Sequence, residues 1–223
     1  MVKTPEKTVK AEATRAAILE AALDQFRDDG FDASTMQAIA DRAGVAKSAA
    51  YYYFPAKDAI INAWYESIQT QVETLCTEAF VRLPKLRDRL GVAMFAKLDS
   101  TRKDRRLLGI VFRYTGEPDH PLSCLGKQQA GMRIRATNIF RDAIGSEKLP
   151  VDLHQLLPVA LWSMQMGLLI MFLYDNSPNQ RRTRRLADGA LDLTIKLLVL
   201  VKLPILRPVR TRVLTLLKDA DLL

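Results

Sequence analysis

The chain has 223 residues, of which 48% are hydrophobic and 26% charged, a composition that indicates a folded globular protein and excludes a disordered or fibrous one. Its formal net charge of +8 and pI of about 9.6 suggest a polyanionic partner without identifying it. Residues 1–57 carry 8 Lys/Arg and 8 Asp/Glu, a net of zero. The excess positive charge lies in residues 82–148 and 181–223, so net charge alone does not locate a binding surface.

Cysteine usage and the N-terminus both favour a cytoplasmic protein. Cys76 and Cys124 lie in predicted helices without CxxC spacing, and we expect buried free thiols in a reducing compartment. The first residues are polar and basic and contain neither the apolar segment nor the cleavage site of a secretion signal.

Apolar residues recur with helical period along the chain, and no stretch alternates with period two for long enough to predict a sheet. The predicted fold class is therefore all-α. Residues 1–9 are polar and predict an N-terminal arm. We expect helices at about 12–29, 34–43, 47–53, 57–81, 85–99, 103–114, 122–145, 152–174, 178–202 and 206–218.

Residues 36–55 have the pattern of a helix-turn-helix. Ala40 supplies the small side chain that two steeply crossing helices need at their contact. Gly44 supplies the residue that tolerates positive φ in the turn. The apolar wedge between the helices would come from Ile39, Val45 and Ala50.

The first helix of this motif has a recognisable start. Ser34-Thr35-Met36-Gln37 fits a capping box, in which Ser34 caps the helix and the Gln37 side chain reaches back to the backbone N–H of Ser34. Free backbone N–H groups and hydroxyls at a helix N-terminus favour phosphate, and Thr35 is the candidate for that contact.

The same region resembles the N-terminal domain of TetR/AcrR-type transcriptional regulators over about residues 12–62. The matching positions agree in order and spacing: Thr14-Arg15, Ile18-Leu19-Glu20-Ala21-Ala22, Phe26, Gly30-Phe31, Ser34-Thr35, Ile39-Ala40, Ala43-Gly44-Val45-Ala46-Lys47, Tyr51-Tyr52-Tyr53-Phe54 and Lys57-Asp58.

The resemblance implies that double-stranded DNA is the partner and that a short recognition helix contacts it. The implied DNA-binding residues are Ser34, Thr35, Lys47, Ser48, Ala49, Tyr51, Tyr52 and Lys57. Tyr51 and Lys57 would meet phosphates, whereas Ser48 and Ala49 stand near the helix N-terminus, where side chains reach base edges. Two departures from the family pattern, Ala46 and Ala56, replace hydroxyl-bearing capping residues and leave the contacts of those hydroxyls in doubt.

The aromatic run that ends the recognition helix has a second reading as plain core. Tyr53 and Phe54 are assigned to the core. Four consecutive aromatics on a helix cannot all face inward, so at least one of Tyr51 and Tyr52 must be exposed.

For the rest of the chain, the resemblance implies a helical ligand-sensing and dimerisation domain. The expected division is an arm at 1–9, a three-helix DNA-binding domain at 10–56 and the helical domain at 57–223, joined through the long helix at 57–81. The segment Leu156–Tyr174 is apolar on every side and must be buried all round, which a homodimer interface would allow. A second capping box at Ser177 would open the next helix, and the candidate dimer contacts are Trp162, Leu169, Leu186, Leu193 and Leu197.

Residues 153–174 lack Asp, Glu, Lys and Arg and are long enough to span a bilayer, which is the alternative reading of this helix. His154, Gln155 and Pro158 weaken that alternative, and no membrane partner is expected.

Residues that would line a small-molecule pocket in this family are found on several predicted helices, although each also suits a core or a surface. The candidates are Phe112, Arg113, Tyr114, His120, Cys124, Met132, Trp162, Gln165 and Met166.

Two other kinds of function compete with that of a DNA-binding regulator. An enzyme is disfavoured because the two histidines, His120 and His154, have no ligand-like spacing and no nucleophile or phosphate-binding motif occurs, so no metal or cofactor is expected. A purely structural helical protein would not need Lys47 and Tyr51 around a helix-turn-helix. The sequence therefore predicts a ligand-responsive transcriptional repressor that binds a pseudo-palindromic operator as a homodimer.

Overall fold

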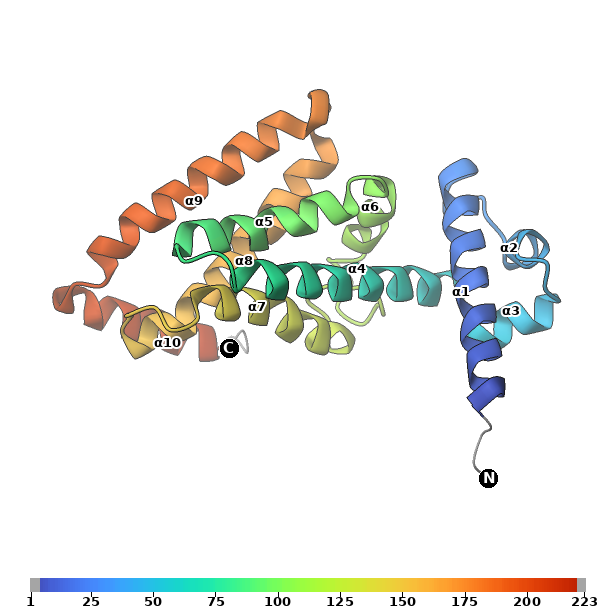
Figure 1. The fold of residues 1–223 in the computed structure, drawn as a ribbon, viewed down its shortest axis with the longest axis horizontal. Helices are drawn as coiled ribbons and strands as arrows, with labels where there is room; N and C mark the ends of the chain where they lie inside the picture. Colours follow the sequence, from blue (N-terminus) through green and yellow to red (C-terminus); the bar gives the residue numbers. More distant parts are fainter. Residues whose placement is uncertain (1–4, 220–223) are drawn as a thin grey trace. The chain divides into compact units, whose positions relative to one another are not determined.

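The computed structural model describes residues 5–219, which are mostly helical and contain no strand (Figure 1). The α-helices are α1 (Pro5–Asp28), α2 (Met36–Arg42), α3 (Lys47–Tyr53), α4 (Lys57–Phe80), α5 (Leu86–Thr101), α6 (Arg105–Arg113), α7 (Ala130–Ile144), α8 (Val151–Tyr174), α9 (Arg181–Val201) and α10 (Arg207–Asp219). Single 3-10 turns precede α7, α9 and α10 at Lys127–Gln129, Pro178–Gln180 and Pro204–Leu206. The expected all-α fold is confirmed.

The chain divides into two compact units that do not coincide with the expected boundary after residue 56. Of the described residues, the first unit comprises those up to Ser67 together with Asp104–Gln129, and so adds α6 and the segment after it to the helix-turn-helix. The second unit comprises Ile68–Lys103 and the described residues from Ala130 onward. Helix α4 contributes residues to both units.

Two expected helix starts differ from the structure by more than three residues. Helix α1 already begins at Pro5, so the arm expected at residues 1–9 is helical from there, and its residues 1–4 lie outside the described part of the chain. The helix expected at 122–145 is wrong over its first turns, because α7 begins only at Ala130. Residues 114–126 form turns, and a Cβ at Gly126 would approach the Pro118 carbonyl oxygen to 2.6 Å, which requires glycine in this fold.

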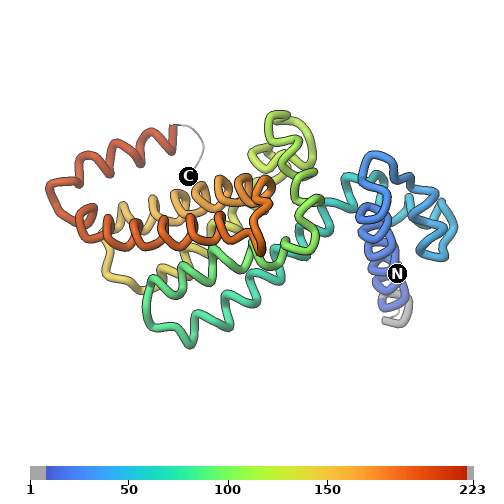
Figure 2. The backbone as a smooth tube through the Cα atoms, turned by 90° about the horizontal axis from the view of Figure 1, so that it is seen from above, coloured from blue at the N-terminus to red at the C-terminus, as the bar shows by residue number. Residues whose placement is uncertain are grey.

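Helix α8 is the central helix of the second unit, with α5, α7, α9 and α10 packed against it (Figures 1 and 2). Leu161, Leu169 and Phe172 are buried on its inner side. Gln165 is also buried, and its Nε2 donates to the Ala93 carbonyl of α5 at 3.0 Å. Among the described helices α8 is long and apolar enough to cross a membrane. Its inner side packs against the neighbouring helices, but Ile170 and Tyr174 are exposed, so the expectation that this segment is buried all round does not hold within one chain.

The start of α9 is capped by a residue that the sequence did not single out. Asp175 Oδ2 accepts hydrogen bonds from the Thr183 N–H at 2.9 Å and from its hydroxyl at 2.8 Å. Its Oδ1 accepts from the backbone and hydroxyl of Ser177, and these bonds hold the pKa of the Asp175 carboxyl far below its usual range. The predicted capping box at Ser177 is wrong, because Asn179 and Gln180 adopt φ of 55° and 50° and α9 begins after them.

A polar network crosses the core of the second unit. The Lys97 side chain of α5 is 2% exposed, and its Nζ donates to Gln69 Oε1 of α4 at 2.9 Å. Gln69 Nε2 donates to Glu73, which receives two further bonds from the Arg135 guanidinium of α7 at 2.9 and 2.6 Å. Burial lowers the pKa of Lys97 to about 7.

This burial predicts a pH dependence of stability. Because the pKa of Lys97 is about 7 in the folded protein and about 10.4 in an unfolded chain, the unfolded state binds more protons above pH 7. The free energy of unfolding should therefore rise between pH 7 and 9. Above pH 9 Cys76, whose pKa burial raises to about 12, acts in the opposite sense.

The measurement is the thermal midpoint at pH 7, 8 and 9 for the wild type and for Lys97→Met. We expect the difference between the two proteins to shift in favour of the wild type as pH rises. Parallel profiles would show that Lys97 does not titrate in this range.

Candidate nucleic-acid interface

Helix α2 is capped by Thr35. Its backbone is extended, with φ of −115°, and its Oγ1 accepts from the Ala38 N–H at 3.1 Å. The Thr35 side chain is exposed at the start of the helix, where the hydroxyl hydrogen remains available to an acceptor outside the protein. The residue expected to touch a phosphate is therefore also the cap.

The capping box was predicted one residue too early. Ser34 is buried and its hydroxyl donates to the Gly30 carbonyl at 2.6 Å, so it closes the preceding loop. Gln37 does not reach back, because its Nε2 donates to Asp41 Oδ1 at 2.7 Å. Ser34 therefore lies inside the unit, away from any surface that could meet DNA.

The turn between α2 and α3 has the geometry that the motif requires. Gly44 has φ of +65°, and the Val45 N–H donates to the Ala40 carbonyl at 3.0 Å. The side chains of Ile39, Ala40 and Ala50 are completely buried where the two helices meet. Small residues at this contact let α3 cross α2 closely, and the expected helix-turn-helix is present. Val45, which was expected in the apolar wedge with Ile39 and Ala50, is only half-buried.

Helix α3 divides its side chains between the interior and solvent. Ala50 is buried, as is Phe54, which follows the helix and receives the Arg15 guanidinium over its ring at 4.8 Å. Tyr51 and Tyr52 are 45% and 80% exposed. The other members of the exposed face are Lys47 and Ser48, with Ala49 half-buried beside them and Tyr53 half-buried at its end.

The start of α3 lacks a side-chain cap, as the departure from the family pattern suggested. Its N-cap residue is Ala46, which makes no side-chain hydrogen bond. The first backbone N–H groups of α3 therefore gain nothing from a cap.

Lys57 occupies a different position from the one expected. Its Nζ donates to the carbonyl oxygens of Phe31, Ser34 and Asp32 at 2.6, 2.8 and 3.3 Å. The ammonium also lies 4.6 Å from the centre of the Phe31 ring. Lys57 thus ties the start of α4 to the loop before α2, and its three donors point into the protein instead of toward a phosphate.

Helix α6 is joined to the same region by two ion pairs. Arg27 near the end of α1 binds the Asp104 carboxylate through Nε and Nη2 at 2.7 and 2.9 Å. Arg113, the last residue of α6, binds Asp32 through Nη1 and Nη2 at 2.9 and 3.2 Å. Neither pair was predicted, since residues about 80 positions apart carry no local sequence signal for their contact.

Among the ligand-pocket candidates in the first unit, Tyr114 and His120 contact each other, whereas Cys124 and Arg113 contact other residues. Tyr114 stacks on His120 with ring centres 3.6 Å apart, and His120 Nε2 lies 3.6 Å from Asp58. Cys124 is half-buried, not fully buried as expected, and its sulfur lies 3.4 Å from the Thr115 hydroxyl. Arg113 is exposed and forms an ion pair with Asp32, while Phe112 is half-buried.

The candidates in the second unit are spread along α7 and α8. Trp162 and Gln165 are buried, whereas Met132 and Met166 are half-buried. Two cavities in this unit, of about 510 and 410 Å³, are lined by other residues near the α7–α8 loop and beneath α10. Within the described residues no three His, Cys, Asp or Glu side chains are grouped to hold a metal ion.

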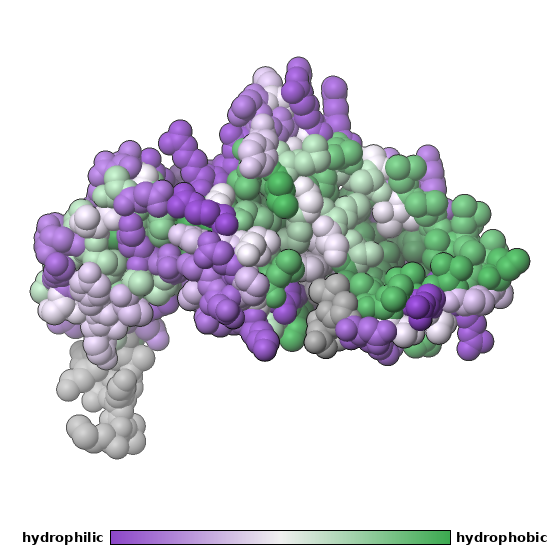
Figure 3. Space-filling view, turned by 180° about the vertical axis from the view of Figure 1, so that it is seen from behind, coloured by the Kyte–Doolittle hydropathy of each residue, from purple (hydrophilic) through white to green (hydrophobic). Residues whose placement is uncertain are grey.

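The candidate dimer contacts separate into two classes. Trp162 and Leu169 of α8 are buried within the single chain and cannot form a surface. Leu186, Leu193 and Leu197 of α9 are 45%, 60% and 53% exposed. They belong to an extended apolar surface that continues toward α10 (Figure 3).

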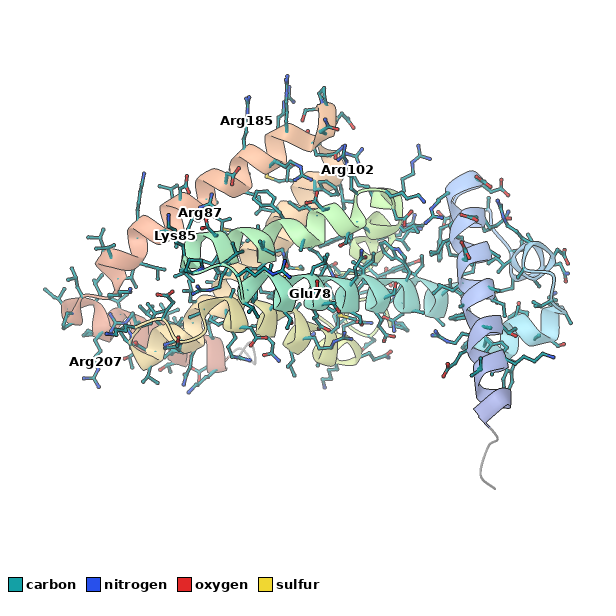
Figure 4. The ribbon with its side chains drawn as sticks, in the orientation of Figure 1. Glu78, Lys85, Arg87, Arg102, Arg185 and Arg207 are labelled. Atoms are coloured by element: carbon teal, nitrogen blue, oxygen red, sulfur yellow. The ribbon has the colours of Figure 1, made fainter. Side chains whose placement is uncertain are left out.

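Charged side chains border this apolar surface along the α5 side of α9 and at the start of α9. On the α5 side of α9, Arg87 binds Asp188 and Asp192, and in Figure 4 Arg185 projects outward from the first turns of the helix. The apolar rows of α9 therefore face away from these ion pairs, which leaves them free to contact another molecule.

Two family models and a curated relative match parts of this chain. Residues 18–64 match the model for bacterial regulatory proteins of the tetR family, and residues 89–211 match the tetracyclin repressor-like C-terminal domain. The HTH-type transcriptional regulator RutR of Escherichia coli K12 is 47% identical over 63 residues, which is 28% of this chain and 30% of RutR. The match thus spans less than a third of the length of this curated relative.

Solved structures share the fold at low identity. A TetR transcriptional regulator from Nitrosomonas europaea is 20% identical with a TM-score of 0.64, covering 80% of this chain and 96% of its own. FadR from Bacillus subtilis, solved in complex with stearoyl-CoA, is 18% identical with a TM-score of 0.58, covering 79% of this chain and 96% of its own.

The geometry predicts opposite roles for two lysines. Lys57→Met keeps the alkyl chain but removes the ammonium from three carbonyls, and we expect a loss of roughly 2 kcal/mol of stability. Lys47→Met on the exposed face of α3 should leave the unfolding midpoint unchanged. Chemical denaturation of both variants measures this, and equal midpoints would contradict a supporting role for Lys57.

Proposed function

Because the chain belongs to the tetR family of bacterial regulatory proteins, which are DNA-binding transcriptional regulators and not enzymes, we propose that it is a homodimeric repressor. It binds a pseudo-palindromic operator and is released by a small-molecule effector in the cytoplasm. The observation that carries the proposal is the exposed polar and aromatic face of α3, held outward by a packed helix-turn-helix.

On the DNA side, α3 enters the major groove. Lys47 and Tyr51 lie one turn apart on its exposed face and contact phosphates, because both present hydrogen-bond donors beyond the surface of the unit. Ser48 and Ala49 in the first turn read base edges, where serine can serve as donor or acceptor and alanine can touch a thymine methyl. Tyr52 and the Thr35 hydroxyl flank this surface and add backbone contacts.

On the dimer side, α8 and α9 supply the interface. Helix α8 exposes a row of small and apolar residues at spacings of 4, 3 and 4: Ser163, Gly167, Ile170 and Tyr174. Helix α9 exposes a second row at spacings of 7, 4 and 3: Leu186, Leu193, Leu197 and Leu200. Rows with this spacing pack helices side by side, so the two helices and their symmetry mates form a four-helix bundle.

The effector enters the helical body and acts through α4. This helix carries residues of both compact units, so a displacement of its C-terminal half reaches Lys57 and the loop that Lys57 holds. Such a displacement respaces the two recognition helices of the dimer and lowers operator affinity. The stearoyl-CoA complex of FadR, which has a similar fold, supports a ligand site in this architecture.

The DNA-binding surface is tested by selecting sequences from a random DNA pool with the wild-type protein and measuring variants on the selected site. Lys47→Ala should weaken binding on all sequences and reduce the salt slope by about one. Ser48→Ala should instead change which bases are selected. Failure of the wild type to enrich any sequence at low salt would refute the proposal.

The interface is tested by the pair Leu193→Lys and Leu197→Lys, which places charge on the exposed row of α9. We expect sedimentation to show a monomer for the variant and a dimer for the wild type, because a charge at an apolar interface is left unpaired. Val81→Lys is the matched control, since Val81 is equally apolar and 87% exposed outside both rows. A dimeric Leu193→Lys/Leu197→Lys protein would place the interface elsewhere.

A further inference from the structure

Each end of helix α6 forms an ion pair with the helix-turn-helix region. Helix α6 contributes the carboxylate to one pair and the guanidinium to the other. At its start, Asp104 supplies the acid and Arg27 of α1 the base. At its end, Arg113 supplies the base and Asp32 of the α1–α2 loop the acid. Both pairs use two nitrogens and two oxygens, the geometry that fixes orientation as well as distance.

The two pairs differ in exposure. The inner pair, Arg27–Asp104, has side chains that are 30% and 9% exposed. Asp104 is the N-cap residue of α6, yet it makes no capping bond, because its carboxylate is turned to Arg27. Removing one partner would leave a buried charge, so this pair is costly to break.

The outer pair, Arg113–Asp32, has side chains that are 48% and 74% exposed. An ion pair this accessible is screened by salt and contributes little on its own, although the Arg113 guanidinium lowers the pKa of Asp32. The outer pair can therefore open while the inner pair remains closed.

The outer pair acts on a loop that already has a second attachment. Asp32 belongs to the short loop whose carbonyl oxygens, at Phe31, Asp32 and Ser34, bind the Lys57 ammonium. The next residue, Thr35, caps α2. Helices α4 and α6 thus converge on one loop, directly before the helix that packs against α3.

We propose that the outer pair is a releasable contact through which α6 controls the α1–α2 loop, with the inner pair as the fixed point about which α6 turns. This regulation rests on the proposed function in one respect, that the helix-turn-helix binds DNA. Asp104 follows Lys103 of the second unit directly in the chain, so the inner pair holds α6 next to one of the points at which the chain passes between the units. Opening the outer pair frees Asp32 and loosens the cap at Thr35.

The test uses Asp32→Asn, Arg113→Gln and the exchanged pair Asp32→Arg/Arg113→Asp in the full chain. Hydrogen–deuterium exchange over residues 31–38 should be faster in both single variants and return toward the wild-type rate in the exchanged pair. Arg106→Gln is the control, because Arg106 is exposed on α6 and forms none of the ion pairs seen among the described residues. It should not change the exchange rate.

DNA affinity, measured on a site selected by the wild type, supplies the second readout. Both single variants should bind about two- to fivefold more weakly at low salt, since both break the same pair, and the difference should vanish at high salt. A simple effect of protein charge on DNA would act differently: Asp32→Asn would strengthen binding and Arg113→Gln would weaken it.

Three outcomes would overturn the inference: unchanged exchange in both single variants, opposite shifts in their affinity, or no recovery in the exchanged pair. A wild type that binds no DNA would refute the proposed function instead, and the exchange data would still decide whether the outer pair holds the loop. Arg27→Gln provides a comparison for the inner pair and should lower the unfolding midpoint more than Arg113→Gln does.

Discussion

The contact on which the DNA-binding unit depends is a single ammonium group against three carbonyl oxygens. Lys57 lies at the first position of α4, and the loop that it holds leads from α1 to the cap of α2. Without this contact the carbonyls of Phe31 and Ser34 would need other donors, since buried backbone acceptors are rarely left unpaired. The orientation of α2, and with it that of α3, is therefore fixed partly by α4. The same helix also contributes residues to the second unit.

Several acidic residues of the DNA-binding segment are held in ion pairs. Asp24, Asp28 and Asp32 bind Arg27, Arg42 and Arg113 in that order, so much of the negative charge is balanced inside the unit. Lys47 forms none of the ion pairs of the described residues, and it stands on the exposed face of α3. The electrostatic field at the recognition helix thus depends on where the individual charged side chains lie. A net charge of zero over residues 1–57 is therefore compatible with a polyanionic partner.

Sequence reasoning succeeded where the signal is local and failed where it depends on distant residues. Gly44 at positive φ and Ala40 at the helix contact follow from turn and packing chemistry within a few positions, and both were predicted. The cap was assigned to Ser34 instead of Thr35, because either residue fits the pattern and only the loop geometry separates them. Lys57 was read as a DNA contact, since its partners lie about 25 positions away and leave no trace in the local sequence.

The uniformly apolar α8 illustrates a further limit of sequence and how structure resolves it. A pattern without an amphipathic face cannot distinguish residues buried within one chain from those buried between two chains. The structure turns Leu169 and Phe172 inward and leaves Gly167, Ile170 and Tyr174 outside. Because α9 contributes a leucine row of matching spacing, the exposed half of α8 has a neighbour with which to form an interface. One helix thus supplies both the core of the unit and the surface proposed for the dimer, so a change in the core packing of α8 would be felt directly at the subunit contact.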